Sequence, residues 1–173
     1  MLCAPYVSST AQAVRTMLAL AELRPSDVVI DLGCGDGRVL FAAALDCGAR
    51  RAIGYELRDD LCRAAVVEAS RLGLSGTVEI RCADLFDADL ADGSVVVAYL
   101  GTVANETLRP RLEIAARADT RVVTNTFPMA GWLPSSVCVK EVASCDGQVA
   151  MDAIYLYRLP LAFRWRQDSL KGE

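Results

Sequence analysis

The residues best suited to chemistry in this 173-residue chain form a short turn with three glycines and two aspartates. The turn follows the apolar run DVVIDL and reads Asp31-Leu32-Gly33-Cys34-Gly35-Asp36-Gly37-Arg38. Glycines let the backbone turn sharply and let a ligand approach where a Cβ would block it. A helix that starts directly after such a turn offers free backbone N–H groups. The pattern predicts a ligand-binding turn between a strand and a helix, with Gly33 and Gly35 against the ligand.

Two classes of cofactor bind at such a turn, and the charges distinguish them. A dinucleotide fingerprint is GxGxxG, with the pyrophosphate at the helix N-terminus. Here the third glycine comes one residue early, and Asp31 and Asp36 would bring two negative charges to the pyrophosphate. S-adenosylmethionine carries an ammonium and a sulfonium group, which acidic residues attract. The turn therefore predicts S-adenosylmethionine as the cofactor, with Asp36 beside it and Asp31 holding the amino group of its methionine part.

Two more acidic residues follow the next two predicted strands. Glu56 ends RAIGYE, near the spacing of roughly 20 residues at which an acid contacts ribose hydroxyls. Asp84 lies in VEIRCADLF, where its side chain can accept a hydrogen bond from the exocyclic amine of adenine. Leu85 beside it can pack on the ring. Glu56, Asp84 and Leu85 are thus predicted to bind the nucleoside part of the cofactor.

Alternating helix and strand signals surround these residues and predict the elements that position them. We expect helices at 8–23, 38–47, 58–72 and 106–118, and strands at 27–32, 51–55, 77–82, 94–100 and 121–124. Two further strand-like runs, 137–143 and 149–158, are separated by Asp146-Gly147, a strong hairpin signal. This order predicts an α/β fold with a Rossmann-like, doubly wound, seven-stranded sheet, mostly parallel with a C-terminal antiparallel hairpin. We expect one domain over 1–173, with an N-terminal helical segment, 1–24, and a C-terminal tail, 160–173.

The composition excludes several classes of function. The formal net charge of −4 argues against a dedicated nucleic-acid-binding protein. The chain has no histidine, which excludes His-ligated metals and imidazole acid–base catalysis. Its 7 cysteines form no CxxC pair, so we expect no metal site and interpret them as structural residues of a cytoplasmic protein. No apolar run reaches the ~20 residues of a membrane span.

With these residues in hand, the chain resembles the class I (seven-β-strand) S-adenosylmethionine-dependent methyltransferases. Within that superfamily it is similar to the protein-lysine methyltransferases that modify the ATP synthase c-subunit and the adenine nucleotide translocase. The resemblance covers about residues 5–134, and it rests on Pro5-Tyr6-Val7, the glycine turn, Gly54-Tyr55-Glu56-Leu57, Asp84-Leu85-Phe86, Tyr99-Leu100, Arg121-Val122-Val123-Thr124-Asn125-Thr126-Phe127 and Trp132-Leu133-Pro134.

The resemblance implies methyl transfer to a lysine of a protein substrate, with membrane proteins among the candidate substrates and no nucleic acid. It implies that Tyr6 lies over the methionine end of the cofactor, although Tyr6 could equally pin the first helix to the sheet. Tyr99 would hold the acceptor amine by its hydroxyl, unless it is a half-buried core residue. Asn125 and Phe127 would line the acceptor channel, and Trp132 is interpreted as packing. The chain departs from the family at Ser8 and at 101–102, where relatives often have proline.

Methyl transfer from a sulfonium is an in-line displacement that depends on proximity, alignment and removal of water. A lysine amine, with a pKa of about 10.4, must first lose a proton, and a desolvated pocket beside a cation favours the neutral amine. Two alternatives stay open: a small-molecule or RNA methyltransferase on the same fold, and a non-catalytic module that keeps the pocket as a partner surface. The complete set Asp31, Glu56 and Asp84 argues against the second, and the net charge argues against RNA.

Overall fold

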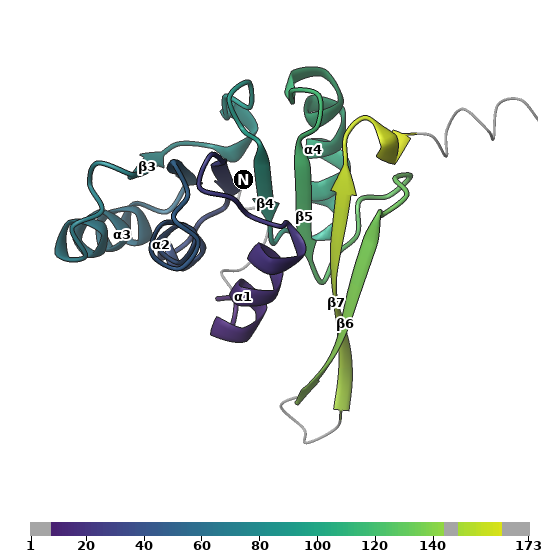
Figure 1. Ribbon diagram of the computed structural model, residues 1–173, viewed down its shortest axis with the longest axis horizontal. Coiled ribbons are helices and arrows are strands. Elements are labelled where there is room, and N and C mark those ends of the chain that lie inside the picture. Colours follow the sequence, from purple (N-terminus) through teal and green to yellow (C-terminus); the bar gives the residue numbers. More distant parts are fainter. Residues whose placement is uncertain (1–7, 144–148, 164–173) are drawn as a thin grey trace, which may run out of the picture.

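The computed structural model describes residues 8–143 and 149–163, with side chains up to Val139 and again from Asp152 in the C-terminal hairpin. Within that part of the chain it forms a seven-stranded sheet in the order β3-β2-β1-β4-β5-β7-β6. The strands are β1 (Val28–Leu32), β2 (Arg51–Glu56), β3 (Val78–Cys82), β4 (Val95–Ala98), β5 (Arg121–Asn125), β6 (Ser136–Ala143) and β7 (Val149–Arg158). The first five are parallel, and β7 runs antiparallel to β5 and β6. The predicted fold class is confirmed (Figure 1).

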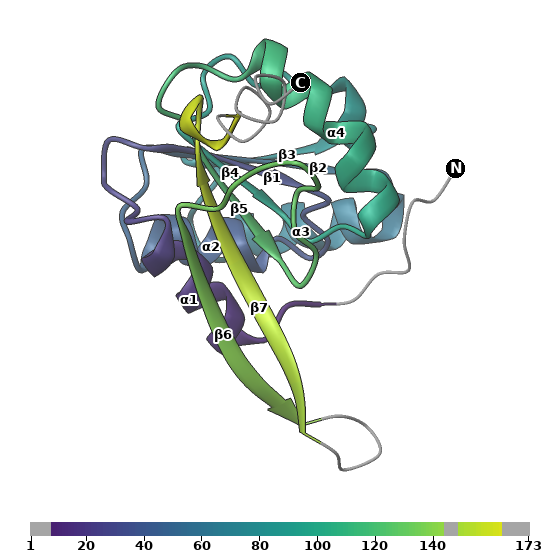
Figure 2. The same cartoon turned by 90° about the vertical axis from the view of Figure 1, so that its right-hand side faces the viewer.

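The sheet is covered by helices on both faces (Figure 2). One face packs against α1 (Ala11–Leu20), α2 (Arg38–Leu45) and α3 (Asp59–Arg71), with Met17, Leu40 and Ala65 in its core. The other face packs against α4 (Thr102–Ala115) and the short 3₁₀ helices η1 (Leu85–Asp87) and η2 (Leu161–Phe163), with Leu108 and Leu112 in its core. Strands β1, β4 and β5 are buried along their whole length, as expected for central parallel strands with apolar, β-branched residues.

The fourth helix begins earlier than the sequence predicts. The predicted helix starts at 106, but α4 starts at Thr102, directly after Tyr99, Leu100 and Gly101. Ala104, Leu108 and Leu112 are buried, and their spacing of four residues places them on one helix face. Packing of this face against the sheet therefore outweighs the low helix propensity of Thr102 and Val103. The predicted Asp146-Gly147 turn lies outside the described residues.

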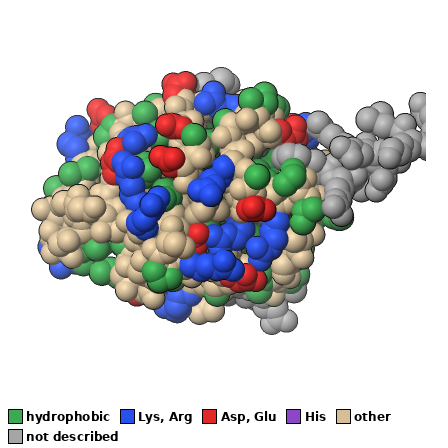
Figure 3. Space-filling model, turned by 45° about the horizontal axis from the view of Figure 1, so that its top comes forward, with side chains coloured by type: hydrophobic (Ala, Val, Ile, Leu, Met, Phe, Trp, Pro, Cys, Tyr) green, Lys and Arg blue, Asp and Glu red, His purple; other side chains and the backbone are tan. Residues whose placement is uncertain are grey.

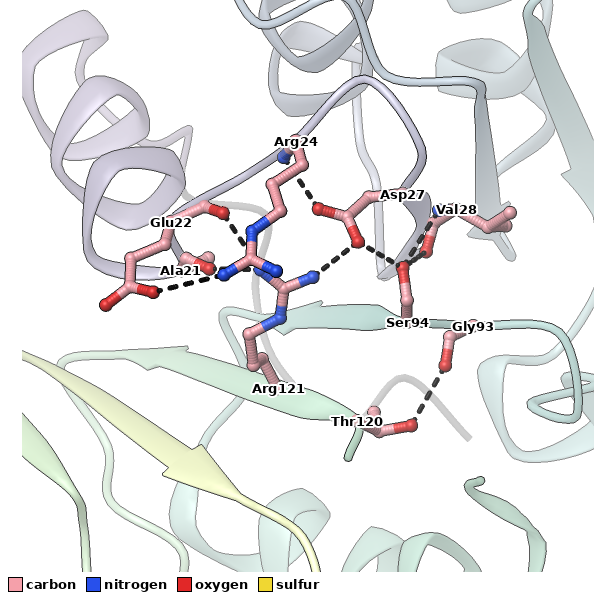
Figure 4. Close-up of polar contacts among 9 residues, drawn as sticks. All are labelled: Ala21, Glu22, Arg24, Asp27, Val28, Gly93, Ser94, Thr120 and Arg121. Carbon is pink, nitrogen blue, oxygen red and sulfur yellow. Dashed lines mark hydrogen bonds and ion pairs between the residues drawn. The ribbon is translucent and has the colours of Figure 1, made fainter. Parts of the chain in front are cut away.

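A buried ion pair joins four elements at the amino-terminal end of the parallel strands (Figure 4). The guanidinium of Arg121, 7% exposed, pairs with the carboxylate of Asp27, 4% exposed. Arg121 Nη1 also donates to the carbonyl oxygens of Ala21 (2.7 Å) and Glu22 (2.9 Å), just after α1. The Ser94 hydroxyl, just before β4, donates to Asp27 at 2.8 Å. The pair therefore fixes the end of α1 against the starts of β1, β4 and β5.

Candidate active site

Strand register places four of the predicted site residues in one row across the carboxyl edge of the sheet. In the parallel ladders Leu32 lies beside Tyr55 and Ala98, and Ala98 lies beside Thr124. The row that follows by one residue contains, in strand order, Glu56, Gly33, Tyr99 and Asn125. Ligands of open α/β sheets bind at this edge. The topology thus brings together residues that are as much as 92 positions apart along the chain (125 − 33 = 92).

Strand alternation also puts the polar members of this group on one side of the sheet. Val29, Val97 and Val123 pack on the α1–α2 side, and successive strand residues point to opposite faces. Asp31 and Asn125, each two residues after one of these valines within its strand, share that side. Tyr99 follows the same alternation one residue beyond β4. Asp31, the acidic residue of β1, and the two predicted acceptor-side residues are therefore on the same face.

The glycine turn has the backbone that its composition predicts. Gly33, Gly35 and Gly37 have φ values of +85°, +55° and +84°, in the left-handed region that side chains rarely adopt. A Cβ on Gly33 would lie 3.3 Å from Leu100 Cδ2 and 4.0 Å from Leu85 Cδ2. Two apolar side chains that follow other strands thus pack close to Gly33, and the absence of a Cβ permits this close approach.

Asp31 is an uncompensated carboxyl group in this site. Its side chain is 4% exposed, and no cationic side chain among residues 8–143 and 149–163 pairs with it. Desolvation by burial, and then the negative charges of Glu56 and Asp36, raise the pKa of Asp31 to about 7. A bound cation would relieve this cost. These acidic side chains fit the ammonium and sulfonium groups of S-adenosylmethionine and do not fit a pyrophosphate.

Glu56 and Asp36 differ in how much acceptor capacity they leave for a ligand. Glu56 Oε2 accepts from the Gly35 N–H at 2.9 Å and Oε1 from the Arg58 N–H at 2.9 Å; a carboxylate has about four acceptor positions, so two stay available for ribose hydroxyls. The carboxylate of Asp36 instead pairs with Arg38 Nε (2.9 Å) and Nη2 (2.5 Å), which neutralises its charge. The predicted contact of Asp36 with the cofactor stays a prediction.

Asp84 and Leu85 lie where a nucleoside base would be expected. Asp84 Oδ1 accepts from the Phe86 N–H at 3.0 Å and thereby caps η1. This cap directs the chain so that Leu85 approaches Gly33 across the edge of the sheet. An acceptor and an apolar wall are the features that an adenine ring requires. Leu85 lies beside Gly33, and the contact of Asp84 and Leu85 with adenine stays a prediction.

On the acceptor side of the site, two polar groups have no hydrogen-bond partner within residues 8–143 and 149–163. Tyr99 is half-buried, and its hydroxyl forms no hydrogen bond with another described residue. Asn125 is 2% exposed, and its Oδ1 has no partner within the described part of the chain. The predicted role of Tyr6 falls on a residue outside the described ones.

Sequence reasoning missed Asn105, which is 1% exposed on α4 and donates from Nδ2 to Phe127 O at 2.9 Å. The predicted helix began at 106 and so left this residue out. An asparagine between the apolar positions Ala104 and Leu108 was the signal that could have identified it. Trp132 packs edge-on against Tyr157, with ring centroids 5.5 Å apart, as its interpretation as a packing residue predicts.

The cysteines of this region behave as small core residues. Cys62 is buried and its thiol donates to Glu56 O at 3.2 Å, and burial, followed by the influence of Cys82, raises the pKa of the Cys62 thiol to about 12. Burial also raises the pKa of Cys34. Within the described residues no cluster of three or more Cys, Asp or Glu side chains could hold a metal ion, and no described helix is long and apolar enough to span a bilayer.

Comparison with known proteins identifies the family of this chain. Residues 31–136 match the model of the ANTKMT methyltransferase domain. This chain belongs to that methyltransferase family. The predicted resemblance to class I methyltransferases is thereby confirmed, and the match covers the glycine turn and extends through β5 to the first residue of β6.

Individual relatives of this methyltransferase support the same family. A protein-lysine N-methyltransferase of Saccharolobus islandicus (strain REY15A) is 37% identical over 88% of this chain and 92% of the relative. The adenine nucleotide translocase lysine N-methyltransferase of Mus musculus is 38% identical over 77% of this chain. The methyltransferase chain spans little more than half of that mouse relative, 57%. A solved structure described as an RNA methyltransferase from Salinibacter ruber in complex with S-adenosyl-L-homocysteine superposes with a TM-score of 0.78 at 36% identity, covering 89% of this chain and 94% of that one.

Proposed function

We propose that this methyltransferase uses S-adenosylmethionine to methylate a lysine side chain of a protein. The observation that carries the proposal is the placement of an uncompensated carboxyl group, Asp31, on one face of the sheet edge with the Tyr99 hydroxyl and Asn125 Oδ1, neither of which has a hydrogen-bond partner in the described part of the chain. The first suits a cationic cofactor and the other two suit an amine. The similarity to a protein-lysine N-methyltransferase over most of both chains supports the same substrate class.

The cofactor is held by residues from three strand ends. Asp31 accepts hydrogen bonds from the ammonium of the methionine part, and Glu56, fixed by the Gly35 N–H at 2.9 Å, accepts from the ribose hydroxyls. Asp84 and Leu85 bind the adenine by a hydrogen bond and by apolar contact. The sulfonium of the bound cofactor supplies the methyl group.

The acceptor amine is aligned by Tyr99 and Asn125. The Asn125 Oδ1 accepts one N–H of the neutral amine and the Tyr99 hydroxyl binds another, so that the nitrogen lone pair points at the methyl carbon. The nitrogen forms the new bond as the sulfur–carbon bond breaks, and the surplus proton of the product ammonium passes to solvent. Burial of the amine beside a cation lowers its pKa, so a chain without histidine can supply this chemistry.

The surface supports a protein substrate over nucleic acid. On the face shown in Figure 3 basic side chains lie among acidic ones, and at the end of α1 Glu22 pairs with Arg24 at 3.8 Å and Arg158 at 3.0 Å. We further propose a cytoplasmic location, since the five cysteines that the structure describes are free thiols and reducing compartments preserve them. Membrane proteins are included among candidate substrates because two mouse relatives are named for the adenine nucleotide translocase and for the c-subunit of ATP synthase.

Labelling in a lysate of the host tests the proposal. Purified protein is incubated with methyl-labelled S-adenosylmethionine, and the label is followed through parallel nuclease and protease digestions and then located by mass spectrometry. The expected result is label on lysine nitrogen in protein, absent when the Asp31→Asn variant is used. Label that is lost on nuclease treatment, or that is confined to small molecules, would replace this substrate class with another.

A further inference from the structure

Three polar side chains of α4 hold the loop that connects β5 to β6. Asn105, Arg109 and Glu113, here called the α4 ladder, are spaced by four residues and therefore share one stripe of the helix. Each bonds a different group of loop 126–135, and the loop runs beside α4 (Figure 1). The bonds are Asn105 Nδ2 to Phe127 O at 2.9 Å, the Arg109 guanidinium to Ala130 O, and Trp132 Nε1 to Glu113 Oε1 at 3.0 Å.

Asn105, the first residue of the α4 ladder, contacts an unusual turn. The Phe127 N–H donates to Asn125 O at 2.7 Å, and the central residue, Thr126, has a φ of +64°. A three-residue turn with positive φ is rare and strained, above all for a β-branched residue. Such a backbone persists only where its surroundings hold it. Here Asn105 holds the Phe127 carbonyl, and Ala153 O of β7 accepts the Thr126 N–H at 2.8 Å.

We propose that Asn105 is a positioning residue for methyl transfer: by holding the turn Asn125–Thr126–Phe127 it fixes the direction of the Asn125 side chain toward the acceptor amine. The proposal rests on the proposed function, which places the Asn125 amide against that amine. Asn125 Oδ1 has no partner among the described residues, so its direction is set by the backbone of the turn and not by a bond of its own.

The ladder also connects the turn to the segment that carries Tyr99. Helix α4 begins at Thr102, three residues after Tyr99, and its residue Asn105 bonds the segment that begins at Asn125. The two groups that face the acceptor amine are thus connected through one rigid helix turn. Because an error of about 1 Å in alignment can lower a rate by roughly a hundredfold, this connection matters for turnover and not for cofactor binding.

The Asn105→Asp variant tests the proposal, because it keeps the side-chain shape and removes the Nδ2 donor. We expect faster hydrogen–deuterium exchange in peptides that span 122–130. For the acceptor protein identified by labelling, we expect kcat to fall roughly ten- to a hundredfold, with the Kd of S-adenosylhomocysteine and the KM of the acceptor within about threefold of wild type.

Two further variants separate positioning from a loss of stability. Thr120→Val removes another buried bond, from the Thr120 hydroxyl to Gly93 O at 2.9 Å, at the opposite end of β5; it should lower the melting temperature and leave kcat unchanged. Thr126→Gly adopts positive φ without strain, so it should fold, yet its freer turn should lower kcat. Thr126→Gly replaces Asn105→Asp as the test of the proposal if Asn105→Asp does not fold.

Each outcome decides one part of the proposal. Unchanged exchange at 122–130 in Asn105→Asp would show that Asn105 does not hold the turn, and faster exchange with an unchanged kcat would show that the turn does not set turnover. Either result overturns the proposal. If wild type labels an acceptor other than lysine, the proposed function fails by itself, and the exchange and kcat measurements on that acceptor still test Asn105.

Discussion

At the scale of one residue, burial of the Asp31 carboxyl group creates a site for a cation and lowers the stability of the ligand-free fold. Its pKa is raised to about 7, first by burial and then by Glu56 and Asp36, so the folded protein takes up this proton more readily than the unfolded chain. Ionisation of Asp31 therefore destabilises the fold progressively as the pH rises from about 4 to about 7, and the cost is constant above that range. A bound ammonium group would offset this loss of stability.

The first prediction concerns the pH dependence of stability. Asp31→Asn should raise the free energy of unfolding of the ligand-free protein, by an amount that grows from pH 5 to pH 7 toward a value on the order of 4 kcal/mol. Denaturant unfolding of both proteins at several pH values measures it. A difference that stays constant with pH would show that the Asp31 pKa is not raised.

The second prediction concerns Glu56. Glu56→Ala removes the acceptor for the Gly35 and Arg58 N–H groups together with the ribose contact, and should weaken S-adenosylhomocysteine binding by about 1.5–3 kcal/mol. Titration calorimetry measures the loss. The matched control is Glu79→Ala on β3, which removes the ion pairs of Glu79 with Arg51 and Arg81 and should leave the affinity unchanged. Equal affinities of the two variants would show that Glu56 does not bind the ribose.

The third prediction concerns Tyr99. If its hydroxyl orients the acceptor amine, Tyr99→Phe should lower turnover by roughly ten- to a hundredfold, which corresponds to about 1.4–2.7 kcal/mol, with cofactor affinity almost intact. If Tyr99 is only a core residue, the same change alters the melting temperature and leaves the rate per folded molecule alone. One kinetic and one thermal measurement separate the two roles.

At the scale of elements, a buried ion pair at the opposite end of the sheet holds together the elements that carry the site. The pair Arg121–Asp27 fixes α1, β1, β4 and β5 relative to one another (Figure 4), and those are the elements that lead to Asp31, Tyr99 and Asn125. A buried ion pair contributes little compared with apolar residues of the same shape, but removal of one partner leaves a charge buried without compensation.

The fourth prediction follows from that asymmetry. Arg121→Met should lower the free energy of unfolding by about 3–5 kcal/mol, whereas the double variant Asp27→Asn with Arg121→Met should lose clearly less. Cofactor affinity per folded molecule should stay the same in both, since neither residue reaches the carboxyl edge. Denaturant unfolding with calorimetry of the folded fraction provides the measurement, and additive losses would contradict the interpretation.

At the scale of the whole molecule, the turn, η1 and the start of α4 converge on one edge, so a ligand there connects segments across the sheet. The fifth prediction is that S-adenosylhomocysteine at 100 times its Kd stabilises the fold by about 2.7 kcal/mol, which raises Tm by roughly 5–11 °C for a chain of this size. NAD should give no shift, and Asp31→Asn should show a smaller shift at the same absolute concentration of S-adenosylhomocysteine. A shift with NAD alone would reverse the cofactor assignment.

The sequence alone determined the fold class and the identity of the cofactor, because both follow from local patterns. Apolar strands, the turn Asp31–Arg38 and an acid after each of the next two strands depend on residue type and spacing, and strand register carried Glu56 and Gly33 to one edge. What tertiary structure decided was the acceptor side. The ladder that begins at Asn105 joins segments about 20 residues apart through side-chain to backbone bonds, and no periodicity encodes such a bond. The raised pKa of Asp31 likewise required its burial near Glu56 and Asp36, which only the packed sheet fixes.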